Sequence, residues 1–280
     1  MVKIISDSTC DLSRELIEKY DIAILPLHIH LGDEEYMDGV NITPDDIYRW
    51  SDANKTTPKT SAASPDSAME LFKQYADREI VCFSISDEMS TTGNVLRMAV
   101  EELELEGRAY VVNSANLSTG IGLMVLEAAI MAQEGKSSGE IVEHIETLKS
   151  QVRSSFVVDT LTYLHRGGRC SSVAALAGGV LQLHPRIVVE NGRMSAGKKY
   201  RGKMQSVIMS YVKDMEEELK QARTERVFIT HSGCDAEVIE MVRGYLEELN
   251  VFDEILITRA GGVISSHCGP GTLGVLYIAG

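Results

Sequence analysis

The chain has 280 residues, of which 44% are hydrophobic and 24% are charged, a balance that excludes collagen-like, coiled-coil and wholly disordered proteins. Acidic residues number 41 and basic residues 27, so the formal net charge is −14, which opposes binding to nucleic acids and to anionic lipid headgroups. At about 100–200 residues per domain, the length predicts two domains with room for a sizeable core.

Short strand-like segments alternate with helical ones through the first half of the chain. Strands are expected at residues 2–5, 22–30, 79–85 and 108–113. Pro26 indicates an edge or a bend in the second of these. Helices are expected at residues 13–20, from 43, from 64, and at 90–106, 117–134 and 137–151. This alternation is typical of βαβ units, so we expect an α/β fold with a doubly wound, mainly parallel sheet.

The second half indicates a mixed α/β arrangement. Strands are expected at residues 154–159, 226–230, 254–259 and 273–279, with helices at 172–183, 203–222 and 235–249. Asn191-Gly192 separates two extended runs and predicts a hairpin, because both turn positions favour positive φ. A glycine-rich loop precedes the last strand. We therefore divide the chain into an N-terminal α/β domain, residues 1–155, and a C-terminal mixed-sheet α/β domain, residues 156–280.

Cysteine usage and apolar runs indicate the compartment. The five cysteines form an odd set without a CxxC pair, which fits reduced thiols better than a disulfide framework or a zinc site. The longest apolar or glycine run, residues 173–181, is far below the ~20 residues that span a bilayer. Asp7 interrupts the N-terminal segment before a signal-peptide core. We expect a cytoplasmic protein without integral membrane association.

Three patterns resemble ligand sites incompletely. His28 and His30 would lie on one face of a strand and could share a metal ion, but without a third ligand nearby we interpret them as half-exposed strand residues. Residues 192–199 nearly form a phosphate-binding loop, yet Lys199 stands where a hydroxyl must hold magnesium. Gly120-Ile-Gly122 lacks the third glycine of a dinucleotide fingerprint. We expect neither a metal nor a cofactor.

Hydroxyl-rich segments follow three of the predicted parallel strands, at residues 6–9, 84–92 and 114–119. Because the carboxyl ends of parallel strands lie at one edge of a sheet, where ligands of doubly wound proteins bind, we expect these segments to converge on a ligand. Thr60 and Ser61 add two further hydroxyls near that edge.

Helix capping is the alternative interpretation of such hydroxyls. We adopt it for Ser13 and Ser64, which directly precede predicted helices. For Thr60, Ser61 and Ser90 the pattern alone leaves both interpretations open.

A cationic loop and one histidine complete the candidate groups. Arg166-Gly-Gly-Arg169 places two guanidinium groups around a flexible backbone directly before a predicted helix, an arrangement that suits an anion. Solvated surface arginines are the alternative. His267 lies in the segment His-Cys-Gly-Pro-Gly, which predicts a tight loop that projects a ring nitrogen as a donor. A structural role is the alternative for this histidine.

Taken together, these segments resemble the DegV family, bacterial fatty-acid-binding proteins that include the lipid-presenting subunit of fatty acid kinase. The matching stretches run nearly from end to end and are SDSTCDL, YMDGVNITPDDIY, TSAASP, SISDEMSTTGN, NSANLSTGIGLMVLEAA, FVVDTLTYLHRGGRCSS and SSHCGPGTLG. The patterns TSxxSP, YLxRGGR and HxGPG occur in this order and are specific. The resemblance implies two α/β domains with the lipid carboxylate between them and the alkyl chain in an internal tunnel.

Position by position, the resemblance implies ligand contacts from Thr60, Ser61, Ser90, Thr91 and His267, and support of phosphoryl transfer from Arg166, Arg169 and His267. The sequence departs from the family's SGLSGT loop, because Asp87-Glu88 replaces Ser-Gly and Thr91 replaces a glycine. Threonine restricts φ and adds bulk, and inward-facing acids would disfavour an anion. We expect both acids to face solvent.

On these grounds we expect a carrier that makes no phosphate bond alone. It would bind a long-chain fatty acid, such as palmitate, and present its carboxylate to the ATP-binding subunit of a fatty acid kinase, which forms the acyl phosphate. The alternative is a serine-dependent acyl hydrolase or acyltransferase, with Ser90 or Ser61 as nucleophile and His267 as base. We expect no nucleophile elbow, which favours the carrier.

Overall fold

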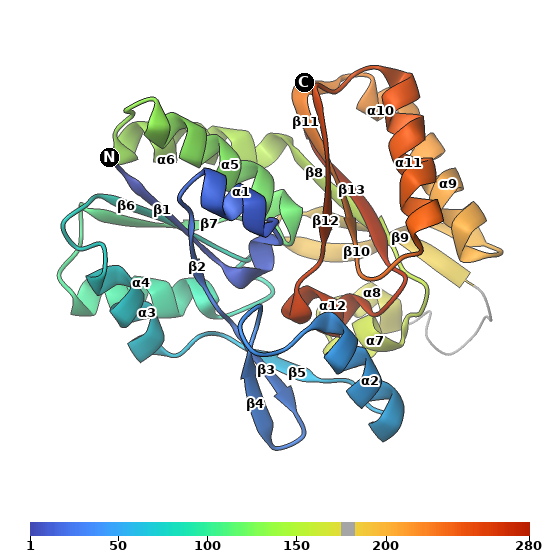
Figure 1. Cartoon of the computed structure of the whole chain (residues 1–280), viewed down its shortest axis with the longest axis horizontal. Helices are drawn as coiled ribbons and strands as arrows, with labels where there is room; N and C mark the ends of the chain where they lie inside the picture. Colours follow the sequence, from blue (N-terminus) through green and yellow to red (C-terminus); the bar gives the residue numbers. More distant parts are fainter. Residues whose placement is uncertain (175–182) are drawn as a thin grey trace.

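The computed structural model describes residues 1–174 and 183–280, which form two α/β halves side by side (Figure 1). The N-terminal half contains a four-stranded parallel sheet and a small three-stranded antiparallel sheet, and the C-terminal half contains a six-stranded mixed sheet. This arrangement confirms the predicted fold class. Within the described residues, no helix combines the length and the apolar character needed to cross a membrane.

The parallel sheet is built from alternating short strands and helices. Its strands, in spatial order, are β2 (Ala23–Leu25), β1 (Lys3–Asp7), β6 (Ile80–Ser84) and β7 (Ala109–Asn113). One face is covered by α1 (Arg14–Lys19), α5 (Thr119–Gln133) and α6 (Ser138–Leu148), and the other by α3 (Pro65–Lys73) and α4 (Thr92–Glu102) (Figure 1). Because helices cover both faces, every residue of β1 and β6 is buried.

Hydroxyl side chains begin the helices where capping was predicted. Ser13 Oγ accepts a hydrogen bond from the backbone N–H of Leu16, and Ser64 Oγ accepts one from Ser67 at 3.1 Å. Thr43 forms a reciprocal capping box at the start of α2 (Pro44–Asn54). Local sequence therefore determines these helix starts.

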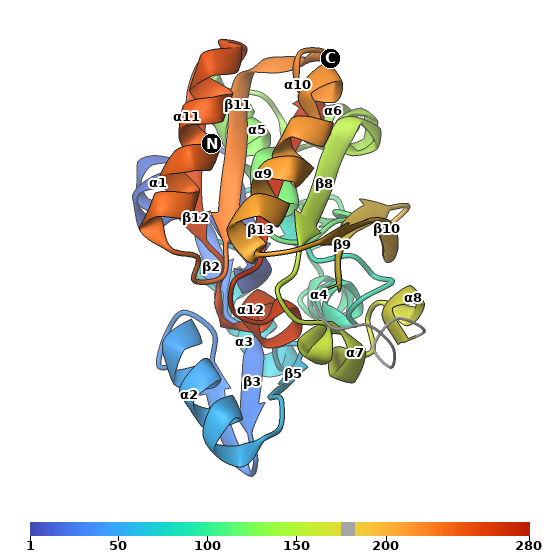
Figure 2. The same ribbon diagram turned by 90° about the vertical axis from the view of Figure 1, so that its right-hand side faces the viewer.

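The six-stranded sheet follows the parallel sheet in the chain. Its strands, in spatial order, are β10 (Arg193–Arg201), β9 (Leu183–Glu190), β8 (Val152–Val157), β13 (Leu273–Ala279), β11 (Ala222–His231) and β12 (Glu254–Arg259). Only β11 and β12 pair in parallel among these described strands. Its outer face is covered by α9 (Met204–Asp214), α10 (Glu216–Leu219) and α11 (Ala236–Leu249) (Figure 2).

Helix α5 lies between the two large sheets and packs against both. It contacts β1 and β6 on one side and β8 and β13 on the other, which explains why most of its residues are buried. Gly120 permits the close approach to β8, because a Cβ there would collide with Ser154 Oγ. Gly122 permits the approach to Cys10, whose carbonyl oxygen would lie 2.9 Å from a Cβ. The glycines of this helix therefore serve packing, and one core joins the two sheets.

The extended segment expected at 22–30 is broken into two strands. Pro26 lacks a backbone N–H, and the chain leaves the parallel sheet there to enter a second one. This small antiparallel sheet has the spatial order β4 (Glu34–Met37), β3 (His28–Leu31) and β5 (Lys59–Ser61). Its last strand contains two of the predicted ligand residues.

Three other predicted elements differ in the structure. The helix expected at 203–222 is two helices, α9 and α10, separated at Met215, and Ala222 already begins β11. The helix expected at 172–183 does not reach Leu183, which begins β9; α8 (Ser171–Ala174) is its start, and residues 175–182 lie outside the described part. The glycine-rich loop before β13 contains a helix, α12 (Gly262–Cys268).

The predicted hairpin at 191–192 is confirmed. Asn191 and Gly192 have φ values of 51° and 77°, and they join β9 to β10. Residues 193–201 are therefore a strand, which rules out a phosphate-binding loop at this position. The remaining elements are α7 (Thr162–Gly167) and two 3₁₀ turns, η1 (Ser8–Cys10) and η2 (Lys149–Gln151).

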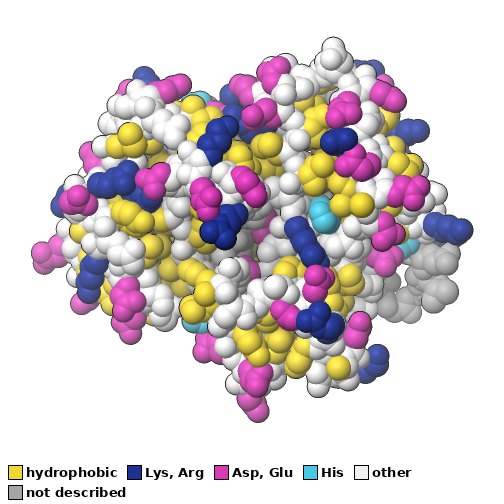
Figure 3. Space-filling model, viewed as in Figure 1, with side chains coloured by type: hydrophobic (Ala, Val, Ile, Leu, Met, Phe, Trp, Pro, Cys, Tyr) yellow, Lys and Arg dark blue, Asp and Glu magenta, His cyan; other side chains and the backbone are white. Residues whose placement is uncertain are grey.

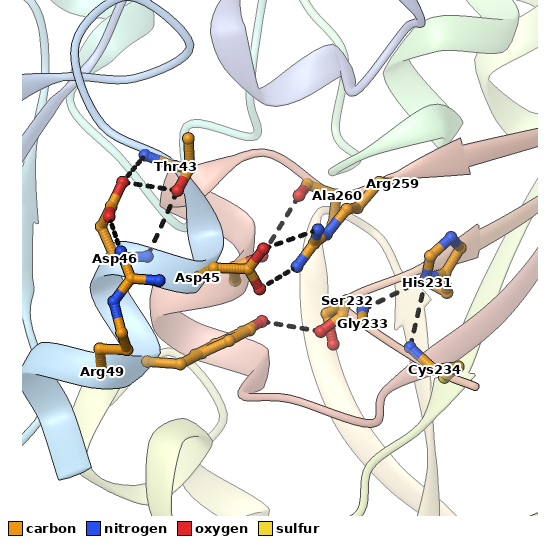
Figure 4. A network of polar contacts seen from close by, with 12 residues as sticks. Thr43, Asp45, Asp46, Arg49, His231, Ser232, Gly233, Cys234, Arg259 and Ala260 are labelled. Carbon is orange, nitrogen blue, oxygen red and sulfur yellow. Dashed lines mark hydrogen bonds and ion pairs between the residues drawn. The ribbon is translucent and has the colours of Figure 1, made fainter. Parts of the chain in front are cut away.

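A polar clasp fastens α2 to the C-terminal half. Asp45 forms two contacts with Arg259 at the end of β12, the longer at 3.1 Å (Figure 4). The hydroxyl of Tyr48 donates to the Ser232 carbonyl oxygen at 2.9 Å. These contacts hold the small antiparallel sheet, and Thr60 with it, against the C-terminal half.

The boundary between the halves lies near β8, the first strand of the mixed sheet. The predicted division between residues 155 and 156 falls inside this strand, and as a division into domains it stays a prediction. Acidic and basic side chains are interspersed on the face shown in Figure 3.

Candidate functional site

A cavity of about 430 Å³ lies where elements from both halves meet. Its polar wall comes from four separate segments, namely Thr60 and Ser61 of β5, Ser90 and Thr91 before α4, Arg169 between α7 and α8, and His267 of α12. Figure 2 shows β5, α7 and α12 gathered in one region below the mixed sheet. The structure therefore brings these six predicted residues to one cavity.

His267 and Thr60 meet across the two halves of the chain. The distance from His267 Nε2 to Thr60 Oγ1 is 2.8 Å, and His267 Nδ1 is buried with no hydrogen-bond partner among the residues that the structure describes. Because an unpartnered buried N–H is rarer than an unpartnered lone pair, we assign the ring proton to Nε2, which donates to Thr60. The hydroxyl hydrogen of Thr60 is then free to donate to a ligand.

The ring of His267 lies directly on the backbone of Gly167. A Cβ at that position would collide with Nδ1, which explains the first glycine of the Arg-Gly-Gly-Arg motif. Burial, with the positive charge of Arg169, lowers the pKa of His267 to about 4. His267 is therefore a neutral imidazole near pH 7.

Ser90 lies two residues before α4 and faces the cavity. Its Oγ accepts a hydrogen bond from the backbone N–H of Thr92 at 3.2 Å and lies 2.8 Å from Thr92 Oγ1. Thr91 is exposed at the cavity with φ −86°, an allowed value, so the threonine in place of glycine causes no backbone strain. Ser61 Oγ lies 3.0 Å from His30 Nε2, a support that the sequence did not indicate.

The two arginines of the Arg-Gly-Gly-Arg motif do not act as a pair. Arg169 lines the cavity and donates to the Gly167 carbonyl oxygen at 2.7 Å. Arg166 does not line it, and its Nη1 lies 3.4 Å from the Lys55 carbonyl oxygen. Arg166 lies in the last turn of α7 and Arg169 follows the helix, and the two side chains contact different backbone carbonyl groups.

The two acids before Ser90 are exposed, as expected, but Asp87 also lines the cavity. Arg97 neutralises it at 3.0 Å. Glu88 is paired with Arg193 at 2.6 Å. The departures from the family pattern therefore place one ion-paired carboxylate at the cavity.

Only one of the three hydroxyl-rich segments supplies hydroxyls to the cavity. From 114–119 only Leu117 lines it, and from 6–9 no residue does. The loops converge, as expected, but their hydroxyls bind protein groups. Ser8 donates to Asp38 and Ser118 donates to Asp11. This corrects the expectation that all three segments contact a ligand.

The remaining wall of the cavity is apolar. It includes Ile85, Met89, Leu117, Met194, Ile264 and Cys268. A second cavity of about 30 Å³ shares Leu117, Ile264 and Cys268 with the first. The second cavity is also lined by Phe156 and Leu276 of the mixed sheet. These residues come from several distant segments, so no local pattern could have indicated them.

The geometry gives no support to a serine nucleophile. Among the described residues, His267 Nε2 is bonded to Thr60, and neither Ser90 nor Ser61 contacts it. The sequence does contain a GxSxG pattern at 135–139, contrary to expectation, but its Ser137 caps α6 between two helices. A nucleophile elbow instead follows a strand. Within the described part, no group of three metal-ligating side chains is close enough to hold an ion.

Comparison with known proteins agrees with this geometry. A DegV family protein from Thermus thermophilus, described by its fatty acid binding, is similar with a TM-score of 0.90 and 28% identity over 99% of each chain. A stearic-acid-binding protein from Eubacterium ventriosum has a TM-score of 0.86 and 31% identity, covering 100% of this chain and 98% of that one.

The sequence itself is matched from end to end. A DegV domain-containing protein of Clostridium perfringens is 30% identical over 279 residues, which is 99% of this chain and 98% of the relative. One of Deinococcus radiodurans is 31% identical over 277 residues, 98% of this chain and 97% of the relative. The family described as "Uncharacterised protein, DegV family" matches residues 1–280. The chain therefore belongs to the DegV family.

Proposed function

We propose that this protein binds a long-chain fatty acid, such as palmitate, with the carboxylate at the polar wall of the cavity and the tail along its apolar wall. The observation that carries the proposal is the cavity itself, which joins hydroxyls of the N-terminal half and His267 and Arg169 of the C-terminal half to an apolar wall. The fatty acid binding described for the Thermus thermophilus and Eubacterium ventriosum proteins supports it.

The headgroup requires donors that replace water. Removing an ionised carboxylate from water costs several kcal/mol. Each hydrogen bond to a charged group contributes about 1.5–3 kcal/mol, so three hydroxyls from Thr60, Ser61 and Ser90 offset that cost. His267 contributes indirectly, because its Nε2–H occupies an acceptor site of Thr60 and leaves the hydroxyl to donate.

The tail supplies the affinity. An acyl chain of about 14–16 methylenes gains roughly 11–13 kcal/mol when fully buried, at about 0.8 kcal/mol each. Association costs on the order of 4–15 kcal/mol, so the tail must be almost wholly enclosed. The cavity of about 30 Å³ beyond Leu117, Ile264 and Cys268 marks the direction in which the tail would extend toward the mixed sheet, and the side chains around it must move apart to admit the tail.

We further propose that the bound carboxylate is presented to a partner kinase. Transfer of the γ-phosphoryl group of ATP to a carboxylate oxygen would form an acyl phosphate and release ADP. Arg169 supports this step because its guanidinium is exposed and lines the cavity, where it can stabilise the transferring anion. The five free cysteines agree with the cytoplasm, where such a kinase finds ATP.

Ser90→Ala is expected to reduce the fatty acid that copurifies with the protein by at least about tenfold, because one charged hydrogen bond is lost. Lipid extraction and mass spectrometry measure this amount. Ser64→Ala is the control, since it also removes a serine hydroxyl that accepts a backbone N–H at the start of a helix, but Ser64 does not line the cavity. Recovery of only polar metabolites from the wild-type protein would contradict the proposal.

Arg169→Ala is expected to lower acyl phosphate formation by a partner kinase more than it lowers fatty acid binding. Arg166→Ala is expected to have the smaller effect on phosphorylation, because that side chain is directed toward Lys55. Both variants are compared by radiolabelled phosphoryl transfer and by a binding titration. Equal losses in the two assays for Arg169→Ala would remove its proposed role.

His267→Gln is expected to make the free energy of unfolding less dependent on pH below pH 6.5. The unfolded histidine takes up a proton near pH 6.5, whereas burial lowers the pKa in the folded protein to about 4. Between pH 6.5 and 5, the free energy of unfolding of the wild-type protein therefore falls by about 1–2 kcal/mol more than that of the variant. Urea unfolding of lipid-free protein at both pH values tests this, and parallel losses would show that His267 is not held neutral.

A further inference from the structure

The SDSTCD segment at the start of the chain does not line the lipid cavity, yet it reaches an element that does. Asp11 Oδ1 accepts a hydrogen bond from the backbone N–H of Gly261 at 2.8 Å. Asp38 Oδ1 accepts one from Gly262 at 2.6 Å. Two carboxylates of the N-terminal half thus bind the first turn of α12, the helix that carries His267.

Each carboxylate is itself held by a serine. Ser118 Oγ donates to the second oxygen of Asp11 at 2.5 Å, and Ser8 Oγ donates to the second oxygen of Asp38 at 2.9 Å. Ser8 Oγ also accepts the backbone N–H of Leu27 at 3.1 Å. Both carboxylates are therefore fixed in orientation before they meet α12.

The contact leaves little room for α12 to move. A Cβ at Gly262 would lie 2.9 Å from Asp38 Oδ1 and 2.6 Å from Ile29 Cδ1, and a Cβ at Gly261 would lie 3.1 Å from Asp11 Oδ1. At position 262 only glycine permits this approach. The start of α12 is therefore packed closely against Asp38 and Ile29.

The arrangement is costly, which argues against a role in stability alone. Asp11 and Asp38 are 5% and 3% exposed, and burial raises the pKa of Asp11 to about 8 and that of Asp38 above its ordinary value. A neutral cap would satisfy the same N–H groups at a lower desolvation cost. With a pKa of about 8, Asp11 is mainly protonated near pH 7, and its oxygen that carries no proton still accepts the N–H of Gly261 and holds the helix.

We propose that Asp11 and Asp38 are positioning residues for the headgroup site, because they fix the start of α12 so that His267 meets Thr60. This inference rests on the proposed function. His267 lies five residues after Gly262, or about 7.5 Å along the helix, so a tilt of about 10° displaces the ring by roughly 1 Å. A hydrogen bond of 2.8 Å does not survive such a displacement.

The test compares Asp38→Ala with Asp38→Asn. The ring ¹⁵N signals of His267, assigned by their loss in His267→Gln, report its contact with Thr60. Asp38→Ala is expected to shift these signals and to weaken palmitate binding by at least about tenfold. Asp38→Asn is expected to restore both, because its amide oxygen still accepts the N–H of Gly262 and its NH₂ group can donate to Ser8.

Asp7→Ala is the matched control. Asp7 is a buried carboxylate of the same segment, but it accepts from Thr9 and Ile85 and does not contact α12. This variant is expected to lose stability while the His267 ring signals stay in place. A shift of those signals as large as that in Asp38→Ala would assign the effect to general loosening and overturn the proposal.

Gly262→Ala approaches the same contact from the helix side and replaces Asp38→Ala if that variant does not fold. Its added methyl group is expected to displace α12 and to shift the same ring signals. Unchanged signals and unchanged palmitate affinity would overturn the positioning role. The ring signals need no lipid, so a wild-type protein that fails to bind palmitate would refute the proposed function while the positioning role is still decided by the spectra.

Discussion

An ionised carboxylate leaves water only where other donors take the place of its hydration shell. Every feature of the cavity follows from this constraint. The donors come from separate segments, namely β5, the segment before α4 and, through His267, α12. A headgroup site of this kind exists only while both halves of the chain are held together.

Two helices hold the halves in place. Helix α5 is buried over most of its length, because it forms the common core of the two large sheets. Helix α12 begins against Asp11 and Asp38 and ends at the cavity. The Asp45–Arg259 clasp closes the outer side, although as an exposed pair it contributes at most about 1 kcal/mol to stability. Apolar packing supplies the stability, and buried polar contacts determine the geometry.

Local patterns predicted the parallel sheet, the helix caps and the hairpin at Asn191-Gly192. Each of these depends on residues a few positions apart, such as Ser64 and the N–H of Ser67. The break at Pro26 was indicated as a bend, but the sheet that β3 enters could not be predicted because its partners, β4 and β5, show no strong strand pattern.

The sequence predicted which polar residues belong to the site better than it predicted how they are arranged. The resemblance identified Thr60, Ser61, Ser90 and His267, and the structure brings them to one cavity. The segment that forms α12 was expected to be a loop. The carboxyl groups that accept its first backbone N–H groups lie 224 and 250 residues away in the sequence, so no local capping pattern indicates where this helix begins. The apolar wall and the separation of Arg166 from Arg169 likewise depend on long-range packing that no local pattern contains.

The most direct test of the central claim is a crystal structure with a fatty acid that carries bromine on its terminal carbon. The account predicts the carboxylate within about 3.2 Å of at least two of the hydroxyls of Thr60, Ser61 and Ser90. It predicts the anomalous signal of bromine beyond Ile264, inside the protein. A bromine at the surface, or a carboxylate bound elsewhere, would contradict it.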